Sequence, residues 1–351
     1  MDQQTQPATR PFWAGKPART TRRGHFWVTA ERVTVSGSTY QRGPMYVFWE
    51  APERVTQPYP VVLVHGGTLQ GTEWGDTPDG RPGWAQRFVE AGYAVLTVDR
   101  PAHGRSPYHT DILGPMGPPF SYDRCRQVYF PEGGGETQWP FDPADDAAFD
   151  AFLAPYGPIP ADLAESQRLD ADRLARLLDR IGPAVVVTHS ASGPDGWLVA
   201  DQRPGLVVAI VAIEPMGPAF SKTPGFGTLD WGLTAAPVTY DPPRMTPDEA
   251  RAADPALLRI PAMAGLPVAV VTGETSSFAK AAPAIVEFLA HAGAAVERLH
   301  LPDHGIHGNG HGLIYEKNSD QALQPVLRWL ERHAANVQAR AVTEEAGNDR
   351  C

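Results

Sequence analysis

One segment constrains the fold more than any other: residues 185–193 read VVVTHSASG. Its β-branched start predicts a buried strand, which stops at Ser190 among small residues. Such a sequence is typical of a strand that turns sharply into a helix. A turn of this kind strains the backbone at the serine and directs the serine Oγ out above the sheet. The Ser190 hydroxyl is therefore expected to meet both another side chain and a ligand.

The pattern along the chain predicts the fold class. Before residue 60, alternating segments at 26–30, 33–35 and 45–49 predict antiparallel strands at the leading edge of a sheet. After it, wholly apolar segments alternate with amphipathic ones, at 61–64, 94–98, 184–188, 206–213, 268–272 and 296–301. Two helices carry leucine-rich stripes: Leu174, Leu177, Leu178 and Ile181 in one, and Leu323, Val326, Leu327 and Leu330 in the other. This alternation predicts an α/β fold, in which helices cover both faces of a mostly parallel central sheet.

Two long segments, 106–165 and 217–265, interrupt the alternation and are rich in Pro, Gly and aromatic residues. Each follows the carboxyl end of a predicted strand, and open α/β sheets bind ligands at that edge. We therefore expect both segments to be cap or lid insertions in a single catalytic domain that spans 25–335. A flexible N-terminal tail at 1–24 and a C-terminal tail at 336–351 complete the predicted organisation.

Charge and cysteine content exclude several classes of function. The formal net charge of −10, from 30 basic and 40 acidic residues, opposes binding to nucleic acid. The apolar run 206–213 is far shorter than the roughly 20 residues that cross a bilayer, so we expect no membrane span. The two cysteines, Cys125 and Cys351, are too few for a disulfide framework, and residues 1–24 contain no apolar core of a secretory signal. We therefore expect a cytoplasmic location.

Two serines compete for the role of nucleophile. The positions two before and two after a serine in a strand-to-helix turn must be small, because strand and helix pass close together there. Ser190 has Thr188 and Ser192 at these positions. Ser192 would have Pro194 there, and a proline ring would crowd the turn. Ser190 is therefore the expected nucleophile.

An alkyl hydroxyl needs a base within hydrogen-bond reach to act as a nucleophile. Three histidines cluster after the last predicted strand: His304, His307 and His311. We expect His311 to be the base, with His307 as the alternative, because a glycine-rich turn before His311 can hold an imidazole over the sheet. Asp303 belongs to the same cluster and would suit a metal site, but the glycines among these residues oppose the helix that would align them. We expect neither a metal nor another cofactor.

A third group must orient the imidazole, and two acids end apolar strands, Glu214 and Glu274. Both follow the serine and precede the histidine, so chain order leaves both open.

The oxyanion of the reaction needs fixed backbone N–H donors. Ala191 should supply one, because it directly follows the nucleophile. Gly67 should supply the other, with Thr68 as the alternative, because the loop after the strand 61–64 can approach a substrate closely. His65 in the same loop is expected to be a structural hydrogen-bonding residue.

These segments together resemble the α/β-hydrolase superfamily and, within it, bacterial esterases of the 713 type. The stretches that carry the likeness are His65-Gly66, Trp74, Thr77-Pro78-Asp79-Gly80-Arg81, Gly83-Trp84, His189-Ser190-Ala191-Ser192-Gly193, Glu214-Pro215 and Gly305-Ile306-His307-Gly308-Asn309-Gly310-His311. Such esterases carry the triad acid as a glutamate after the strand that follows the nucleophile, which implies Glu214. Their catalytic histidine ends the Gly-Asn-x-His run, which implies His311.

The chain departs from this family in the loop after His65-Gly66. Where well-known members have two adjacent cysteines, this chain has Gly67-Thr68. A vicinal disulfide cannot form, so other contacts must make the oxyanion loop rigid.

The resemblance implies a serine hydrolase that cleaves a carboxylic ester through an acyl-enzyme intermediate without a cofactor. Aromatic residues in the two insertions indicate a small-molecule ester with an apolar or aromatic group. A lactonase or amidase with the same triad stays an alternative, as does a catalytically silent binding protein of this fold. The sequence leaves the oligomeric state open, a homodimer included.

Overall fold

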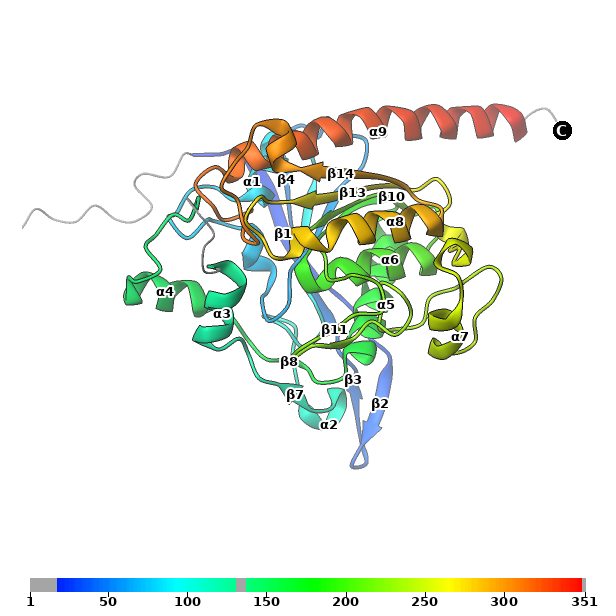
Figure 1. The fold of residues 1–351 in the computed structure, drawn as a ribbon, viewed down its shortest axis with the longest axis horizontal. Coiled ribbons are helices and arrows are strands. Elements are labelled where there is room, and N and C mark those ends of the chain that lie inside the picture. The colour runs from blue at the N-terminus through cyan, green and yellow to red at the C-terminus, as the bar shows by residue number, and fades with distance from the viewer. Residues whose placement is uncertain (1–17, 131–136, 349–351) are drawn as a thin grey trace, which may run out of the picture.

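The computed structural model describes residues 18–130 and 137–348 (Figure 1). Its central sheet has eight strands in the order β1-β4-β6-β5-β9-β10-β13-β14. In that order their bounds are Thr21–Val28, Met45–Pro52, Val95–Asp99, Val61–Val64, Ala184–His189, Val207–Ile213, Pro267–Thr272 and Ala295–His300. β4 is antiparallel to both of its neighbours, and the strands from β6 to β14 run parallel. The predicted α/β fold with a mostly parallel central sheet is confirmed.

Alternate side chains of the parallel strands point into two separate cores. On β5, Val62 and Val64 belong to one buried cluster, while Val61 and Leu63 belong to the other. The first face is covered by α5 (Leu163–Ile181), α6 (Gly193–Gln202) and α8 (Ala282–Ala292), and the second by α1 (Trp84–Glu90) and α9 (Ser319–Asn348). The wholly apolar strands read from the sequence are thus buried on both sides.

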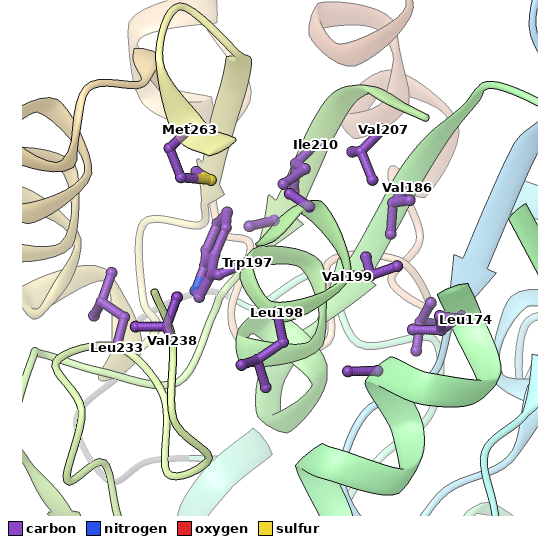
Figure 2. Packing of buried hydrophobic residues seen from close by; sticks show 14 of the residues in the cluster. Leu174, Val186, Trp197, Leu198, Val199, Val207, Ile210, Leu233, Val238 and Met263 are labelled. Atoms are coloured by element: carbon purple, nitrogen blue, oxygen red, sulfur yellow. The ribbon is translucent and has the colours of Figure 1, made fainter. Parts of the chain in front are cut away.

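Trp197 is the largest side chain of the first core shown in Figure 2, where it lies between Met263 and the strand residue Ile210. It is 2% exposed and belongs to α6, the helix that follows Ser190. Leu174, which the leucine spacing predicted to be in the core, is also buried. Truncation of such a buried aromatic ring typically destabilises a protein by about 3–5 kcal/mol. The packing of Trp197 therefore fixes α6 on the sheet.

The two segments expected as insertions contain short elements. The first holds α2 (Thr110–Leu113), β7 (Met116–Gly117), α3 (Tyr122–Tyr129), α4 (Asp146–Leu153) and β8 (Ile159–Pro160), and the second holds β11 (Lys222–Thr223), β12 (Gly227–Thr228) and α7 (Pro247–Ala252). Figure 1 shows α3 and α4 at one end of the molecule and α7 at the other. Six 3₁₀ turns lie among the described residues: Gly71–Trp74, Ser190–Ser192, Pro255–Leu257, Pro261–Met263, Phe278–Lys280 and Leu301–His304.

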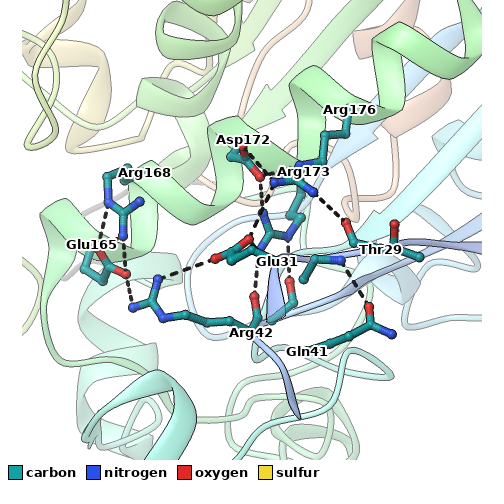
Figure 3. A network of polar contacts seen from close by, with 11 residues as sticks. Thr29, Glu31, Gln41, Arg42, Glu165, Arg168, Asp172, Arg173 and Arg176 are labelled. Atoms are coloured by element: carbon teal, nitrogen blue, oxygen red, sulfur yellow. Dashed lines mark hydrogen bonds and ion pairs between the residues drawn. The ribbon is translucent and has the colours of Figure 1, made fainter. Parts of the chain in front are cut away.

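The segment 33–35 does not lie at the sheet edge where the sequence predicted it. Strands β2 (Arg32–Val35) and β3 (Ser38–Gln41) instead pair with one another in a separate hairpin. The buried Arg173 of α5 holds the hairpin base, since it donates to the Gly43 carbonyl at 2.8 Å and pairs with Glu31 at 2.7 Å (Figure 3). These polar contacts join residues that are distant in the sequence. They fix the position of the hairpin, which the pattern of apolar residues did not predict.

Both predicted tails differ in part from the structure. Residues 21–24 belong to β1, and residues 336–348 continue α9. Residues 18–20 precede β1 without regular secondary structure, and residues 1–17 and 349–351 lie outside the described residues. Within the described part of the chain, no helix combines the length and apolar character needed to cross a membrane.

Candidate active site

Ser190 lies directly after β9, at the start of the 3₁₀ turn that leads into α6. Its φ of +57° is a strained, left-handed conformation for a residue with a side chain. The start of α6 packs closely against the segment that follows β10, because a Cβ added to Gly193 would lie 2.7 Å from Pro215 Cβ. The sharp turn predicted from residues 185–193 is therefore present.

The competing serine, Ser192, is part of the turn itself. Its Oγ accepts a hydrogen bond from the His189 amide at 3.0 Å and lies 3.0 Å from the Val64 carbonyl oxygen, to which it can donate. Ser192 is fully buried, so no substrate can reach its hydroxyl.

His311 faces Ser190 across the site, with Nε2 2.9 Å from the serine Oγ. The ring of Phe278 stacks on the imidazole at a centroid distance of 4.0 Å and fixes its plane. Burial lowers the pKa of His311 well below its ordinary value, and the nearby His189 lowers it further. A neutral imidazole in this position can accept the proton of Ser190 near neutral pH.

Glu214 follows β10 and has a φ of +47°. Its fully buried carboxylate accepts hydrogen bonds from the Gly273 amide at 2.6 Å and the Ser276 hydroxyl at 2.5 Å. Burial raises the pKa of Glu214 to about 7, although these two hydrogen bonds oppose the rise. Glu214 Oε2 lies 3.7 Å from His311 Nδ1, which is too long for a hydrogen bond, and Nδ1 has no other partner among the described residues.

Glu274 and His307, the alternatives for acid and base, contact one another rather than Ser190. His307 Nδ1 lies 3.4 Å from Glu274 Oε1, and Glu274 Oε2 accepts a hydrogen bond from the Gly308 amide at 2.9 Å. The His307 side chain is 62% exposed. In the part of the chain that the structure describes, no three His, Cys, Asp or Glu side chains gather as a metal site.

The backbone of the loop after β5 lies against Ser190. The Gly66 amide donates to Glu73 at 2.6 Å, and the Gly66 carbonyl accepts from Arg100 Nη2 at 3.0 Å. His65 Nδ1 lies 2.8 Å from the same carbonyl, so His65 has the structural part that the sequence predicted. These buried contacts hold the loop in place of a vicinal disulfide. The Gly67 amide has no acceptor among the described residues and remains free to bind a ligand.

A buried ion pair beneath His311 was not predicted. Glu73 Oε1 contacts His189 Nδ1 and accepts a hydrogen bond from the Tyr315 hydroxyl at 2.9 Å, while His189 Nε2 lies 3.0 Å from the His311 carbonyl oxygen. Both nitrogens of His189 face acceptors, so both carry hydrogen. Burial lowers the pKa of His189, but the Glu73 carboxylate outweighs burial, and the pKa is raised above its ordinary value.

Glu73 thereby connects three parts of the site: the loop at Gly66, the strand end at His189 and, through His189, the loop at His311. The sequence did carry one signal for this network. A histidine inside an otherwise apolar buried strand needs a polar partner. Nothing in the local sequence indicates that this partner is Glu73.

A small cavity of about 20 Å³ lies over Ser190, and most of its wall is apolar. The first insertion contributes Phe120 and Tyr129 to this wall, and the second contributes Phe226. The Phe226 ring covers the loop at Gly67, since a Cβ added to Gly67 would lie 2.4 Å from Phe226 Cε1. Both segments expected as insertions therefore contact the site.

Comparisons with known proteins show that the chain is similar to a lipase and to an esterase. No family model matches the chain. A fungal protein named "Probable secreted lipase phiG" (Fungal sp. strain ATCC 74256) is 35% identical over 322 residues, which cover 84% of this chain and 88% of that protein. Among solved structures, a novel bacterial esterase superposes with a TM-score of 0.66 at 23% identity, over 91% of this chain and 98% of the esterase.

Proposed function

Since this chain belongs to the α/β-hydrolase superfamily and is a carboxylic-ester hydrolase, we propose that Ser190, His311 and Glu214 form its catalytic triad. The observation that carries the proposal is the 2.9 Å contact between Ser190 Oγ and His311 Nε2 at a strained turn between strand and helix. Geometry of this kind defines a serine nucleophile and its base more reliably than sequence position does.

In the acylation step, Ser190 Oγ attacks the ester carbonyl carbon while His311 Nε2 takes the hydroxyl proton. The carbonyl oxygen becomes an oxyanion, which the amides of Gly67 and Ala191 bind. Collapse of the tetrahedral intermediate breaks the carbon–oxygen bond to the alcohol. His311 returns the proton to that leaving oxygen, and the acyl group remains on Ser190.

In the deacylation step, a water molecule takes the place of the alcohol. His311 removes a proton from the water as its oxygen attacks the acyl carbonyl. The same two amides bind the second oxyanion. Release of the carboxylic acid returns the proton from His311 to Ser190 Oγ.

Glu214 stabilises the imidazolium that forms in both steps. Glu214 must be ionised to do so. As His311 becomes positively charged, Glu214 Oε2 and His311 Nδ1 must move from 3.7 Å apart to hydrogen-bond distance. Before His311 is protonated, the two hydrogen bonds from Gly273 and Ser276 hold the Glu214 carboxylate beneath the imidazole.

The segments 106–165 and 217–265 act as walls of the substrate site within one catalytic domain. Phe120, Tyr129 and Phe226 support this proposal, because they bring both segments to the cavity over Ser190. An ester with an apolar or aromatic group matches such a wall. Lactones and amides are not favoured as substrates, and neither is a catalytically silent protein.

The cytoplasmic location expected from the sequence is wrong, because a relative of 35% identity is named as secreted. The expectation was based on the low cysteine content and the composition of residues 1–24. Cysteine content does not decide compartment for this chain, since its two large apolar cores need no disulfide framework.

A fluorophosphonate probe tests the assignment of the triad directly. The probe should phosphonylate Ser190, located by peptide mass spectrometry, and should abolish hydrolysis of p-nitrophenyl butyrate in the same sample. Labelling elsewhere together with loss of activity would show that another residue is the nucleophile.

A further inference from the structure

The cavity over Ser190 leads outward into a groove of about 430 Å³. Three residues line both spaces: Phe120, Arg124 and Phe226. The two phenylalanine rings meet edge to face at a centroid distance of 5.8 Å, so they form an aromatic passage between groove and cavity. A ligand that extends from Ser190 to the groove must pass these rings and Arg124.

Arg124 is the one side chain with a permanent charge among the residues that line either space. It belongs to α3 and is half-buried, and it has no ion-pair partner among the described residues. Its side chain makes a single hydrogen bond there, a long one of 3.4 Å to Gln127. The guanidinium therefore keeps most of its donors for a ligand.

The neighbouring Arg126 shows the contrast on the same helix. It donates to the Pro143 carbonyl at 2.6 Å and lies over the Phe149 ring at 4.1 Å. Arg126 therefore stabilises the first insertion through contacts within it, whereas Arg124 lines the groove and the cavity. The chain has a formal net charge of −10, so its overall electrostatic potential is negative. The positive charge of Arg124 at this aromatic passage is a local exception.

We propose that Arg124 binds an anionic group of the substrate, so that this enzyme prefers esters carrying a carboxylate at the end remote from the scissile bond. The proposal rests on the proposed function, because it places the ester carbonyl at Ser190. Guanidinium binds carboxylate through two parallel hydrogen bonds, and apolar walls strengthen that attraction. The rings of Phe120 and Phe226 require an apolar spacer between the carboxylate and the ester.

Two matched pairs of substrates test the proposal. The first pair is p-nitrophenyl hydrogen adipate and its methyl ester, which place the charge on the acyl side. The second pair is 4-acetoxybenzoate and methyl 4-acetoxybenzoate, which place it on the alcohol side. The measured quantity is the ratio of kcat/KM for the anionic and the neutral member, in wild type and in the variants Arg124→Gln, Arg124→Lys and Arg244→Gln.

In at least one pair, Arg124→Gln should lower the ratio by about tenfold, because a charge-assisted hydrogen bond at a partly exposed site is lost. The change should appear mainly in KM. Arg124→Lys should keep more of the ratio than Arg124→Gln. Arg244→Gln removes the same charge three residues before α7, the helix that Figure 1 shows at the opposite end of the molecule from α3, and it should keep the wild-type ratio.

The salt dependence of the wild-type ratio tests the same proposal without any variant, so the proposal stays testable even if a variant folds poorly. The ratio should shrink as the salt concentration rises from about 0.02 to about 0.5 M, because exposed charges are screened. Equal ratios in all variants, or an equal loss for anionic and neutral esters in Arg124→Gln, would overturn the proposal. Failure of the proposed function would look different, since neutral esters would then be hydrolysed without dependence on Ser190.

Discussion

Ser190 and His311 are 121 positions apart in the sequence, yet their Oγ and Nε2 atoms lie 2.9 Å apart. Ser190→Ala removes the attacking oxygen, so kcat for p-nitrophenyl butyrate should fall by about 10⁴-fold or more. Far-UV circular dichroism and the melting temperature should stay close to wild type, because among the described residues the Ser190 hydroxyl hydrogen-bonds only to His311, at the wall of the cavity.

Ser192→Ala is the matched control for that variant. It removes a buried hydroxyl that binds the backbone of the same turn, so it should lower the free energy of unfolding by about 1–2 kcal/mol. It should retain kcat within about tenfold, because the nucleophile remains. A loss of activity in Ser192→Ala as large as in Ser190→Ala would contradict the assignment of the nucleophile.

Glu214 should control the acid limb of the pH profile. Its pKa of about 7 means that kcat/KM should rise through about pH 7 as the carboxylate ionises and becomes able to stabilise the imidazolium. Glu214→Gln should lower kcat by about 10²–10⁴-fold and remove this limb. Steady-state rates between pH 5 and pH 9 measure both effects, and an acid limb that stays near pH 7 in the variant would assign it to another group.

The same pKa shift predicts a change in stability. The folded protein holds the Glu214 proton more tightly than the unfolded chain, where the pKa is near 4.5. The stabilising contribution is therefore complete below about pH 4.5 and is lost as the pH rises through 7. The melting temperature of Glu214→Gln should accordingly rise relative to wild type between pH 5 and pH 8. A difference that is constant over this range would contradict the burial of an ionisable carboxylate.

His189 should set the pKa of the groups above it. Its positive charge lowers the pKa of both His311 and Glu214, so His189→Asn should raise both and move the acid limb of kcat/KM to higher pH. Tyr315→Phe is the control, because it removes one hydrogen bond to Glu73 without a change in charge. It should reduce stability by about 1 kcal/mol and leave the pH profile in place.

Much of this site could be predicted because its signals are local. Residues 185–193 encode a strand, a strained turn and a helix within a few positions, and Ser190 lies where that pattern places it. Glu214 likewise directly follows an apolar strand. Parallel strands bring their carboxyl ends to one edge of the sheet, so a residue at this position is expected near Ser190. The spacing of apolar residues is sufficient to place Ser190, whereas it left Glu214 and Glu274 both open, and only the family resemblance implied Glu214.

The parts that could not be predicted depend on contacts between segments distant in sequence. Glu73 and His189 are 116 positions apart and meet only after β5 and β9 pair. The hairpin of β2 and β3 is held by Arg173, which lies 130 positions beyond Gly43. Buried polar pairs leave no periodic pattern, so the sequence showed that His189 needs a partner but not which residue supplies it.

Gly67 and Gly193 should respond differently to the same added methyl group. A Cβ on Gly193 would lie 2.7 Å from Pro215 Cβ and 3.2 Å from Pro215 Cα, and neither the ring nor the backbone can move away. Gly193→Ala should therefore destabilise the fold by about 1–3 kcal/mol through overpacking at the turn.

A Cβ on Gly67 would instead lie 2.4 Å from the end of the Phe226 side chain, and this ring can rotate away. It would also lie 3.1 Å from Ala191 Cβ. Gly67→Ala should keep its melting temperature within a few degrees but lower kcat by about 10–10³-fold, because the two amides that bind the oxyanion would be forced apart. Thermal melts and rates on the same preparations separate the two effects, and wild-type kcat in Gly67→Ala would show that Thr68 rather than Gly67 supplies the second donor.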